Sequence, residues 1–482
     1  MKLEMLLRGV EVLETNASMD TEIREVRYSS REVQKGDLFA AVPGYATDGH
    51  RYIPDAVGKG AAVVLCEREM PDNTPWVRVA SCREALATIG ANRYGHPARS
   101  MKMIGVTGTN GKTSVTYLVK AILEASIHAK VGLVGTICNM IGSEKLETER
   151  TTPESYELQG LLAQMRDAGC THVVMEVSSH ALFLHRVGGI EYDVGAFTNL
   201  TEDHLDFHGT MDNYRKAKAI LFRNCRRGVF NLDDPTAPKM ISDATCKIYT
   251  VGTSPDAALR AEDVRLFSDG IEARICEGTQ TAELQLGIPG RFTVSNALVA
   301  LGIARQLDVP LAAAVAALRD AKGVKGRLEV VPTPGKDFTV LIDYAHTPDG
   351  LRQLLRSVRD FCGGRLIAVF GCGGDRERAK RHLMGGIAVE YADYVIVTSD
   401  NPRTEEPNAI IRDILAGIDG TSTPYVVEPD RRKAIRMALR FAQKNDIVVL
   451  AGKGHETYQI LGTRKTHLDE REEVAQALRE MN

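Results

Sequence analysis

Residues 105–114 constrain this chain more than any other segment, because they predict a phosphate-binding loop between a strand and a helix. The segment reads Gly-Val-Thr-Gly-Thr-Asn-Gly-Lys-Thr-Ser. The apolar residues 103–104 precede it and the mostly apolar run 115–119 follows it, a pattern typical of a strand, a tight loop and a helix. The glycines let the backbone turn so that successive N–H groups face one anion.

Two side chains at the end of this loop strengthen the prediction. Lys112 adds a positive charge, and Thr113 places a hydroxyl where a phosphate-bound Mg²⁺ would sit. The common form of the loop has a further glycine at the position of Val106, so the match is to a shorter variant, Gly-Thr-Asn-Gly-Lys-Thr at 108–113. A generic glycine turn explains the pattern less well, because Gly-Lys-Thr stands between a strand and a helix. We therefore expect the chain to bind ATP or GTP.

The length and composition indicate a multidomain globular protein. A chain of 482 residues is too long for one hydrophobic core, and the length suggests about three domains. The hydrophobic share of 44% is ordinary for a soluble protein, and the net charge of −3 argues against general binding to nucleic acid. Nine cysteines without a Cys-x-x-Cys pair indicate reduced thiols rather than disulfides or a zinc site.

The hydropathy pattern gives no sign of export or of a membrane. The amino terminus has too short an apolar run for a signal peptide, and no stretch approaches the ~18 apolar residues that a membrane span needs. We expect a soluble, cytoplasmic protein that acts as a monomer and has neither a membrane nor a nucleic acid as a partner.

Short apolar runs divide the first two thirds of the chain. Two runs separated by turns, 38–42 and 61–65, predict a small α/β domain that ends near residues 96–98. From there to about Arg327 strands alternate with helices. The predicted elements are strands at 131–135, 172–176 and 194–197, a β-rich insertion at 257–288, and helices at 294–306 and 311–321.

The last third predicts a second ligand site. Its four apolar strands are separated by helices, which indicates a parallel sheet covered on both faces: 340–342, 366–370, 394–397 and 447–450. Each strand is followed by a polar cluster: 343–346, 371–376, 399–403 and 452–456. Ligands of open α/β sheets bind at the carboxyl ends of the strands, so four such clusters favour a binding site over solvated loops.

Three features of the middle segment fit phosphate chemistry. Glu176 ends an apolar strand, where a carboxylate can hold Mg²⁺ or, equally well, cap the next turn. Residues 198–209 are dense in acids and histidines, which indicates a metal or a phosphate nearby. The following helix at 211–222 carries Arg215, Lys216 and Lys218, and a charge run of this kind predicts a solvated face.

Together these segments resemble the Mur ligase family, which builds the cell-wall peptide by ATP-dependent amide formation. The matching strings lie at 108–113, 176–182, 198–209, 343–348 and 451–456, and at 28–31 and 36–39 in the first domain. The resemblance implies an α/β protein of three domains: a UDP-muramyl substrate-binding domain at 1–98, a central P-loop ATPase domain with a parallel sheet at 99–328, and a Rossmann-like amino-acid-binding domain at 329–482.

The resemblance also implies a reaction. A D-glutamyl carboxylate would attack the γ-phosphate of ATP, and the amine of an incoming amino acid would then attack the resulting acyl phosphate. Asp-Asn-Pro-Arg at 400–403 is similar to members that add meso-2,6-diaminopimelate, rather than L-lysine, to UDP-N-acetylmuramoyl-L-alanyl-D-glutamate. The alternatives are the L-lysine-adding ligase of this step, a ligase like folylpolyglutamate synthase, a nucleotide switch or motor, and a silent scaffold.

The family implies roles for particular residues, whereas spacing alone assigns none of the nucleotide contacts outside the loop. Contacts to ATP are expected from Gly108, Thr109, Asn110, Gly111, Lys112, Thr113, Ser114, Asn296, Arg327, Asp343 and His346. The UDP-muramyl substrate is expected to contact Ser30, Thr151, Thr152, Ser178 and Arg186. Mg²⁺ is expected at Thr113, Glu176, His204 and Lys218, the last as a CO₂-derived carbamate, and the catalytic set is Lys112, Glu176, His204 and Lys218. For Lys218 the resemblance therefore favours a role at the metal site over a solvated position, whereas Arg215 and Lys216 are still expected to be solvated.

Charge complementarity supports the expected amino-acid pocket. Diaminopimelate differs from lysine by a second carboxylate, which a forked guanidinium binds best. Arg403 and Arg376 supply guanidinium groups at neighbouring strand ends, while Asp400 and Glu456 suit ammonium groups. The full expected set is Arg376, Asp400, Asn401, Pro402, Arg403, Gly452 and Glu456, where Gly452 permits a close backbone approach.

Overall fold

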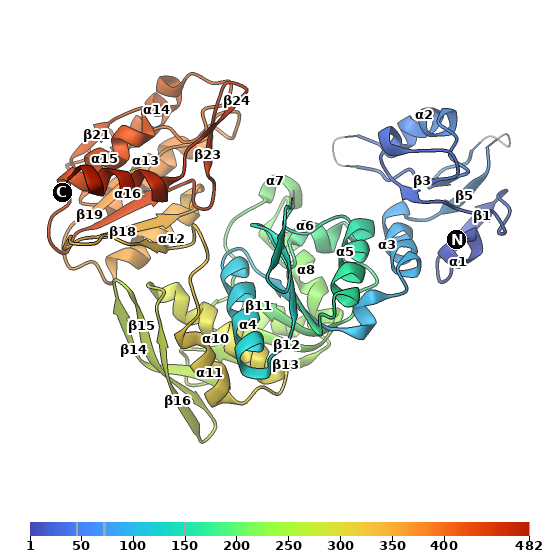
Figure 1. Cartoon of the computed structure of the whole chain (residues 1–482), viewed down its shortest axis with the longest axis horizontal. Coiled ribbons are helices and arrows are strands. Elements are labelled where there is room, and N and C mark those ends of the chain that lie inside the picture. The colour runs from blue at the N-terminus through green and yellow to red at the C-terminus, as the bar shows by residue number, and fades with distance from the viewer. Residues whose placement is uncertain (45–46, 71–73, 149, 482) are drawn as a thin grey trace. The chain divides into compact units, whose positions relative to one another are not determined.

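The protein forms two compact units, each built from α/β layers. The structure is a computed structural model that describes residues 1–44, 47–70, 74–148 and 150–481 (Figure 1). The first unit comprises Met1–Phe230 and Asp234–Tyr249, and the second comprises Asn231–Asp233 and Thr250–Asn482. The predicted α/β class is confirmed, while the boundaries proposed for three domains stay predictions.

The first unit begins with a five-stranded sheet in the order β1-β5-β4-β3-β2. Strands β2 to β5 are parallel, and β1 pairs antiparallel with β5. Alternate residues of β3 and β4 face two cores: Leu38 and Leu65 pack with α1 and α3, whereas Phe39 and Val64 pack with α2. The elements are β1 (Val12–Thr15), β2 (Val26–Arg27), β3 (Leu38–Ala40), β4 (Val63–Cys66), β5 (Trp76–Val79), α1 (Leu3–Leu6), α2 (Ile53–Gly58), α3 (Cys82–Arg93) and the 3₁₀ turns η1 (Ser30–Glu32) and η2 (Gly49–Tyr52).

A second sheet of this unit carries the predicted phosphate loop. It is part of an eleven-stranded sheet, in which these strands run in the order β12-β11-β6-β10-β7-β8-β9, and the five from β12 to β7 are parallel. The elements are β6 (Lys102–Thr107), β7 (Val131–Val134), β8 (Asn139–Ile141), β9 (Glu144–Leu146), β10 (His172–Glu176), β11 (Tyr192–Phe197) and β12 (Cys225–Asn231), with η3 (Pro97–Ser100), α4 (Lys112–Ile127), α5 (Ser155–Asp167), α6 (Ser179–Phe183), α7 (Leu205–His208), α8 (Met211–Ala219), η4 (Ile220–Arg223) and α9 (Ala237–Ser242).

The second unit begins with the β-rich insertion that the sequence predicts. Strands β14 (Leu259–Phe267), β15 (Gly270–Glu277) and β16 (Gln280–Leu286) are antiparallel, and the end of β13 (Lys247–Gly252) pairs with β14. Helices α10 (Arg291–Gln306) and α11 (Leu311–Arg319) pack against these strands (Figure 1). The predicted helices at 294–306 and 311–321 are thus confirmed to within a few residues.

The rest of this unit is a sheet covered on both faces, in the order β17-β18-β22-β19-β20-β21. All neighbours are parallel except β17, and successive residues of β18 face opposite cores: Leu341 packs with α12 to α14, and Val340 with α15 and α16. The elements are β17 (Glu329–Val331), β18 (Thr339–Asp343), β19 (Leu366–Phe370), β20 (Tyr394–Val397), β21 (Tyr425–Val427), β22 (Ile447–Ala451), α12 (Pro348–Arg359), α13 (Ala379–Tyr391), α14 (Pro407–Leu415), α15 (Arg431–Phe441), α16 (Glu470–Glu480) and the hairpin β23 (Tyr458–Leu461) and β24 (Arg464–His467).

Within the described ranges, no helix combines the length and the apolar character that a bilayer crossing requires. All nine cysteines are unpaired, and seven of them are buried.

Trp76 allows the packing of the first sheet to be tested. It is the single tryptophan of the chain and is 5% exposed in β5, so its fluorescence reports on this sheet. Leu65→Ala is expected to lower the free energy of unfolding of this sheet by about 2–5 kcal/mol, because it leaves a cavity at a fully buried position. Urea titration followed by Trp76 emission measures the change. Leu13→Ala is the control, since Leu13 is 51% exposed on β1 and should shift the value by less than about 0.5 kcal/mol. Equal losses in the two variants would contradict this assignment of the core.

Candidate active site

The phosphate loop of the first unit lies between β6 and α4, as the sequence predicts. Gly111 takes a left-handed conformation with φ +84° directly before α4, which begins at Lys112. The Lys112 ammonium donates to the carbonyl oxygens of Gly108 (2.9 Å) and Thr109 (2.8 Å), so its charge lies within the loop. Glycine, the lysine and a helix start therefore occupy the arrangement that binds phosphate groups.

Residues 198–201 hold the loop in shape. The Thr109 N–H donates to the Asn199 carbonyl, the Asn110 N–H donates to the Asn199 side chain, and both distances are 2.9 Å. The Thr198 hydroxyl donates to the Asn110 carbonyl at 2.6 Å. At Gly108, with φ +150°, a Cβ would lie 1.9 Å from the Thr198 hydroxyl, so only glycine fits this contact.

Glu176 lies beside this loop because of strand register. β10 pairs with β6 so that Glu176 is the partner of Val106, two residues before Gly108. Its buried carboxylate accepts from the Thr113 hydroxyl at 3.0 Å and from the Thr136 N–H and hydroxyl at 2.9 Å each. The Thr136 N–H contact agrees with the alternative that Glu176 caps a turn. The Thr113 contact joins two residues that are predicted to bind Mg²⁺.

Lys218 is buried against the same loop. On α8 its side chain is 1% exposed, its ammonium donates to the Gly108 carbonyl at 2.8 Å, and it lies 4.4 Å from the centre of the Tyr214 ring. Burial, and after it the charge of Lys112, lower the pKa of Lys218 well below its usual value. Desolvation of the Lys218 side chain in this way disfavours its charged ammonium form.

The other two cations of α8 differ in exposure. Lys216 has a side chain that is 59% exposed, as the charge run predicts. The prediction of a solvated face is wrong for Arg215, whose side chain is only 11% exposed because it forms ion pairs with Asp212 and Asp243. Arg215 and Lys216 thus both pair with Asp212, and of the two Lys216 alone stays exposed, while Lys218 is deeply buried.

His204 lies at the edge of this cluster. Its half-exposed ring lies 3.3 Å from the Asp203 carboxylate and packs edge-on against His180 at 4.8 Å between ring centres. Burial lowers the pKa of His204, against the charges of Asp203 and Asp206, and the charges of Lys112 and Lys218 act in the same direction as burial. The imidazole is therefore favoured in its neutral form, which is the form that ligates metals.

The groups around the loop suit Mg²⁺ bound jointly with phosphates. Across residues 1–44, 47–70, 74–148 and 150–481, no three His, Cys, Asp or Glu side chains are grouped so that they could hold a metal ion. Mg²⁺ is usually bound by one or two protein oxygens together with phosphates and water. The paired Thr113 hydroxyl and Glu176 carboxylate fit that pattern, because both present oxygen at the loop.

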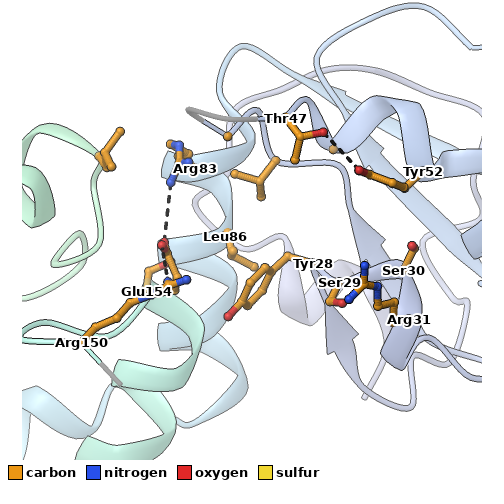
Figure 2. Close-up of a pocket in the computed structure, with 15 residues that line it drawn as sticks. Tyr28, Ser29, Ser30, Arg31, Thr47, Tyr52, Arg83, Leu86, Arg150 and Glu154 are labelled. Atoms are coloured by element: carbon orange, nitrogen blue, oxygen red, sulfur yellow. Dashed lines mark hydrogen bonds and ion pairs between the residues drawn. The ribbon is translucent and has the colours of Figure 1, made fainter. Parts of the chain in front are cut away.

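A pocket of about 370 Å³ opens between the first sheet and the start of α5 (Figure 2). Figure 2 shows Tyr28 to Arg31 and Tyr52 on the side of the first sheet, facing Arg83, Arg150 and Glu154. Of the five residues expected to contact a UDP-muramyl substrate, Ser30 lines this pocket. The volume and the mixture of hydroxyl, aromatic and guanidinium groups suit a nucleotide-sized polar ligand.

Glu154 gathers three arginines at this pocket. It forms ion pairs with Arg150 (2.8 Å), Arg186 (3.0 Å) and Arg83 (3.6 Å). One carboxylate among three guanidinium groups leaves a local excess of positive charge, which favours an anionic ligand. Arg186, expected to contact the substrate, is thereby tied to the pocket wall.

The remaining expected substrate contacts lie together near Glu176. The Thr152 hydroxyl donates to the Glu176 carbonyl at 2.9 Å and accepts from the Ser178 N–H at 3.4 Å. The Thr151 hydroxyl lies 3.0 Å from that of Thr136. This row of hydroxyl groups therefore connects the carboxylate at the phosphate loop with the segment that leads to Glu154.

In the second unit, three of the four expected nucleotide contacts lie together. The buried Asp343 carboxylate accepts from the N–H groups of Leu328 (2.7 Å) and Ala345 (2.8 Å), and burial raises its pKa although the nearby Arg327 acts against this. The Arg327 guanidinium lies 5.0 Å from the centre of the Tyr344 ring, and His346 Nδ1 lies 2.8 Å from the Tyr344 carbonyl.

The fourth expected contact, Asn296, is buried on α10. Among the described residues, no hydrogen bond joins it to Arg327, Asp343 or His346. The structure therefore groups three of these residues and leaves Asn296 without a direct link to them.

The residues expected to bind the amino acid lie where β20 and β22 end. The Asn401 amide donates to Glu456 at 2.9 Å, and the Arg403 guanidinium donates to the Gly374 carbonyl at 2.7 Å. At Gly452, with φ +116°, a Cβ would lie 2.6 Å from an Asp400 carboxylate oxygen, which explains why glycine occupies this position.

Arg376 lies beside Gly373, close to Arg403. Its exposed side chain donates to the Asp375 carbonyl, and a Cβ at Gly373 would lie 3.8 Å from Arg376 Cγ and 2.9 Å from Arg403 Nη1. The two guanidinium groups thus flank one glycine. The structure brings the expected carboxylates and guanidinium groups to one edge of the sheet.

Several residues of these sites escaped the sequence analysis. Thr136 directly follows the predicted strand at 131–135, so its position at a strand end was an available signal. Arg83 and Glu154 lie in ordinary helical or loop sequence, and nothing in their neighbours marks them. Lys453 lies inside the cluster at 452–456 that the sequence singled out, but its burial and partners depend on Asn401, which is 52 residues away.

Comparison with known proteins gives a consistent result along the whole chain. Family models match at residues 22–94 (Mur ligase family, catalytic domain), 106–304 (Mur ligase middle domain) and 326–454 (Mur ligase, glutamate ligase domain). A UDP-N-acetylmuramoyl-L-alanyl-D-glutamate--2,6-diaminopimelate ligase of Clostridium botulinum is 44% identical and covers 100% of both chains. The protein of the same name from Caldanaerobacter subterraneus is 46% identical over 100% of this chain and 99% of its own. A solved structure of a ligase with that name has a TM-score of 0.74 and 32% identity over 100% of this chain and 99% of its own.

Proposed function

The chain belongs to the Mur ligase family, and we propose that it is an ATP-dependent ligase that joins meso-2,6-diaminopimelate to UDP-N-acetylmuramoyl-L-alanyl-D-glutamate. The observation that carries the choice of amino acid is the set of charged side chains at one sheet edge of the second unit. There the carboxylates of Asp400 and Glu456 lie at the same sheet edge as the Arg403 guanidinium. Meso-diaminopimelate has two ammonium and two carboxylate groups, so it needs both signs of charge in its pocket.

The first unit would carry out the activation step. The loop amides and Lys112 would hold the phosphates of ATP while the D-glutamyl carboxylate attacks the γ-phosphorus and ADP leaves. This chemistry needs alignment and neutralised charge more than a protein nucleophile. Ser30, Thr151, Thr152, Ser178 and Arg186 would hold the UDP-linked substrate, which is supported by the positively charged pocket at Glu154 and by the hydroxyl row at Glu176.

Mg²⁺ would be held by Thr113 and Glu176 and, for a second ion, by His204 and Lys218. When bound, it supplies positive charge that stabilises the phosphate oxygens during transfer. We propose that Lys218 serves as a carbamate, formed by its amine and CO₂. The support is its burial against the Gly108 carbonyl, because a carbamate would replace an unfavourable buried cation by an anion beside the metal ions.

The second unit would supply the amine. Asp400 and Glu456 would bind ammonium groups and Arg403, with Arg376, the distal carboxylate. The free amine then attacks the acyl carbon, and the tetrahedral intermediate expels phosphate to leave the amide bond. Arg327, Asp343 and His346 would contact the nucleotide, which is supported by their grouping at the end of β18. Both nucleotide substrates are soluble, and we place the reaction in the cytoplasm.

Two related activities remain alternatives with different acceptors. An L-lysine-adding ligase would need no cation for a distal carboxylate, so the position of Arg403 favours diaminopimelate. A ligase like folylpolyglutamate synthase would act on a pterin, whereas the pocket at Glu154, lined by Ser30 of η1, suits the UDP-linked substrate.

Phosphate release tests the proposed function directly. The assay contains ATP, Mg²⁺ and UDP-N-acetylmuramoyl-L-alanyl-D-glutamate. The enzyme is expected to release phosphate at least about tenfold faster with meso-diaminopimelate than with L-lysine, because one hydrogen bond to a charged group contributes enough binding free energy for a tenfold difference. A coupled phosphate assay measures both rates, and mass spectrometry identifies the product. Rates that do not depend on the amino acid would favour a nucleotide switch instead.

Lys218→Ala is expected to reduce turnover at least about 100-fold, because it removes a charged group at the site of phosphoryl transfer. Lys216→Ala on the same helix is the matched control, since the exposed Lys216 side chain should be dispensable. Carbon-13 NMR of enzyme equilibrated with ¹³C-bicarbonate should show a carbamate signal that Lys218→Ala loses and Lys216→Ala keeps. The carbamate proposal fails if the two variants give the same spectrum.

Arg403→Ala is expected to raise the KM for diaminopimelate about 10- to 100-fold, because a charge-assisted hydrogen bond contributes about 1.5–3 kcal/mol. The KM for ATP should change little. Steady-state kinetics with each substrate varied in turn measures both, and Arg464→Ala on the exposed hairpin is the control. An equal rise in both KM values would show that Arg403 has no specific role toward the amino acid.

A further inference from the structure

Lys453 is a buried cation behind the proposed diaminopimelate pocket, and the function described above does not use it. Its side chain is 0% exposed. The ammonium donates to the Asn401 side-chain oxygen Oδ1 at 3.1 Å and to Glu456 Oε2 at 2.9 Å. It thus contacts two residues of the proposed pocket from the protein side.

These contacts fix which way the Asn401 amide points. Its oxygen accepts from Lys453 and from the Ile460 N–H at 3.0 Å, so both neighbours are donors. A reversed amide would place its NH₂ group against two donors, which is strongly unfavourable. The NH₂ group therefore faces Glu456, to which it donates at 2.9 Å.

Glu456 is oriented by the same cation. Its Oε2 atom accepts from both Lys453 and Asn401, while the side chain stays 14% exposed. A carboxylate this deep needs a paired charge, because an isolated buried anion is costly. Lys453 supplies the charge on one side and so leaves the exposed part of the carboxylate available to a ligand ammonium.

The adjacent hairpin secures the same loop. From β23, the Gln459 amide donates to the Asp400 carbonyl at 2.7 Å, and the Ile460 carbonyl accepts from the Arg403 N–H at 3.1 Å. The pocket loop at 400–403 is thus bound by its backbone to the hairpin and by the Asn401 side chain to Lys453. Among the residues that the structure describes, Lys453 is the charged group that contacts both this loop and Glu456.

We propose that Lys453 is a positioning residue for the diamino acid, acting through Asn401 and Glu456 without touching the ligand. The inference rests on the proposed function, since it takes these two residues as ligands of the amino acid. A role confined to fold stability would lower the amount of active enzyme and leave every KM unchanged. A positioning role changes the KM for one substrate alone.

The test compares three variants by steady-state kinetics and thermal unfolding. Lys453→Met is expected to raise the KM for meso-diaminopimelate at least about tenfold, since small misplacements of binding groups are costly. The KM values for ATP and for the UDP-linked dipeptide should stay within about twofold. Lys453→Gln keeps two N–H donors without the charge, so it should recover part of the loss. Lys465→Met is the matched control, because Lys465 is exposed on β24 of the same hairpin.

The outcomes separate this proposal from the function on which it rests. If Lys453→Met does not fold, the KM for diaminopimelate in Lys453→Gln decides. An unchanged KM for diaminopimelate, or an equal rise for ATP, overturns the positioning role while the unmodified enzyme still turns over. An unmodified enzyme that releases no phosphate with meso-diaminopimelate overturns the proposed function and this inference together.

Discussion

Parallel strand register is the constraint on which both candidate sites depend. In the first unit, Glu176 is the partner of Val106, and Phe197 is the partner of Thr107. The loops that follow β6, β10 and β11 therefore begin side by side. In the second unit, Asp343 and Ala451 are partners in the same way. Parallel neighbouring strands have their carboxyl ends at the same edge of the sheet. Polar residues that follow different strands in the sequence therefore lie close together at that edge.

Close backbone approach is the second requirement at these edges. At Gly108 a Cβ would collide with the Thr198 hydroxyl, at Gly452 with Asp400, and at Gly135 it would lie 2.6 Å from Glu176 Oε1. In each case glycine is required because another strand end occupies the space that a side chain would take. The glycines of these loops thus serve packing as well as turning.

The sequence predicted the fold class, the main strands and the loop between β6 and α4, while its assignment of residues to sites stays a prediction. It did so because apolar runs of strand length and the polar residues directly after them are local signals. Glu176 is the last residue of β10, Asp400 follows the end of β20 by three residues, and Lys112 begins α4 after the loop that follows β6. The partners of these residues could not be predicted in the same way. Glu154 gathers arginines from three separate segments, and Lys453 meets an amide from another loop, so only the tertiary structure reveals them. Arg215 shows the reverse error, because a charge run on a helix gives no sign of which member finds acidic neighbours.

The division of the chain into units has a consequence for how it can be cut and made. Residues Asn231–Asp233 belong to the second unit, yet Asp234–Tyr249, which include α9, return to the first. No single cleavage point therefore yields two complete halves. During synthesis from the amino terminus, Asn231–Asp233 of the second unit are made before Asp234–Tyr249 complete the first. A fragment that ends at Tyr249 includes Asn231–Asp233 of the second unit, whereas a fragment that ends at Phe230 lacks Asp234–Tyr249 of the first.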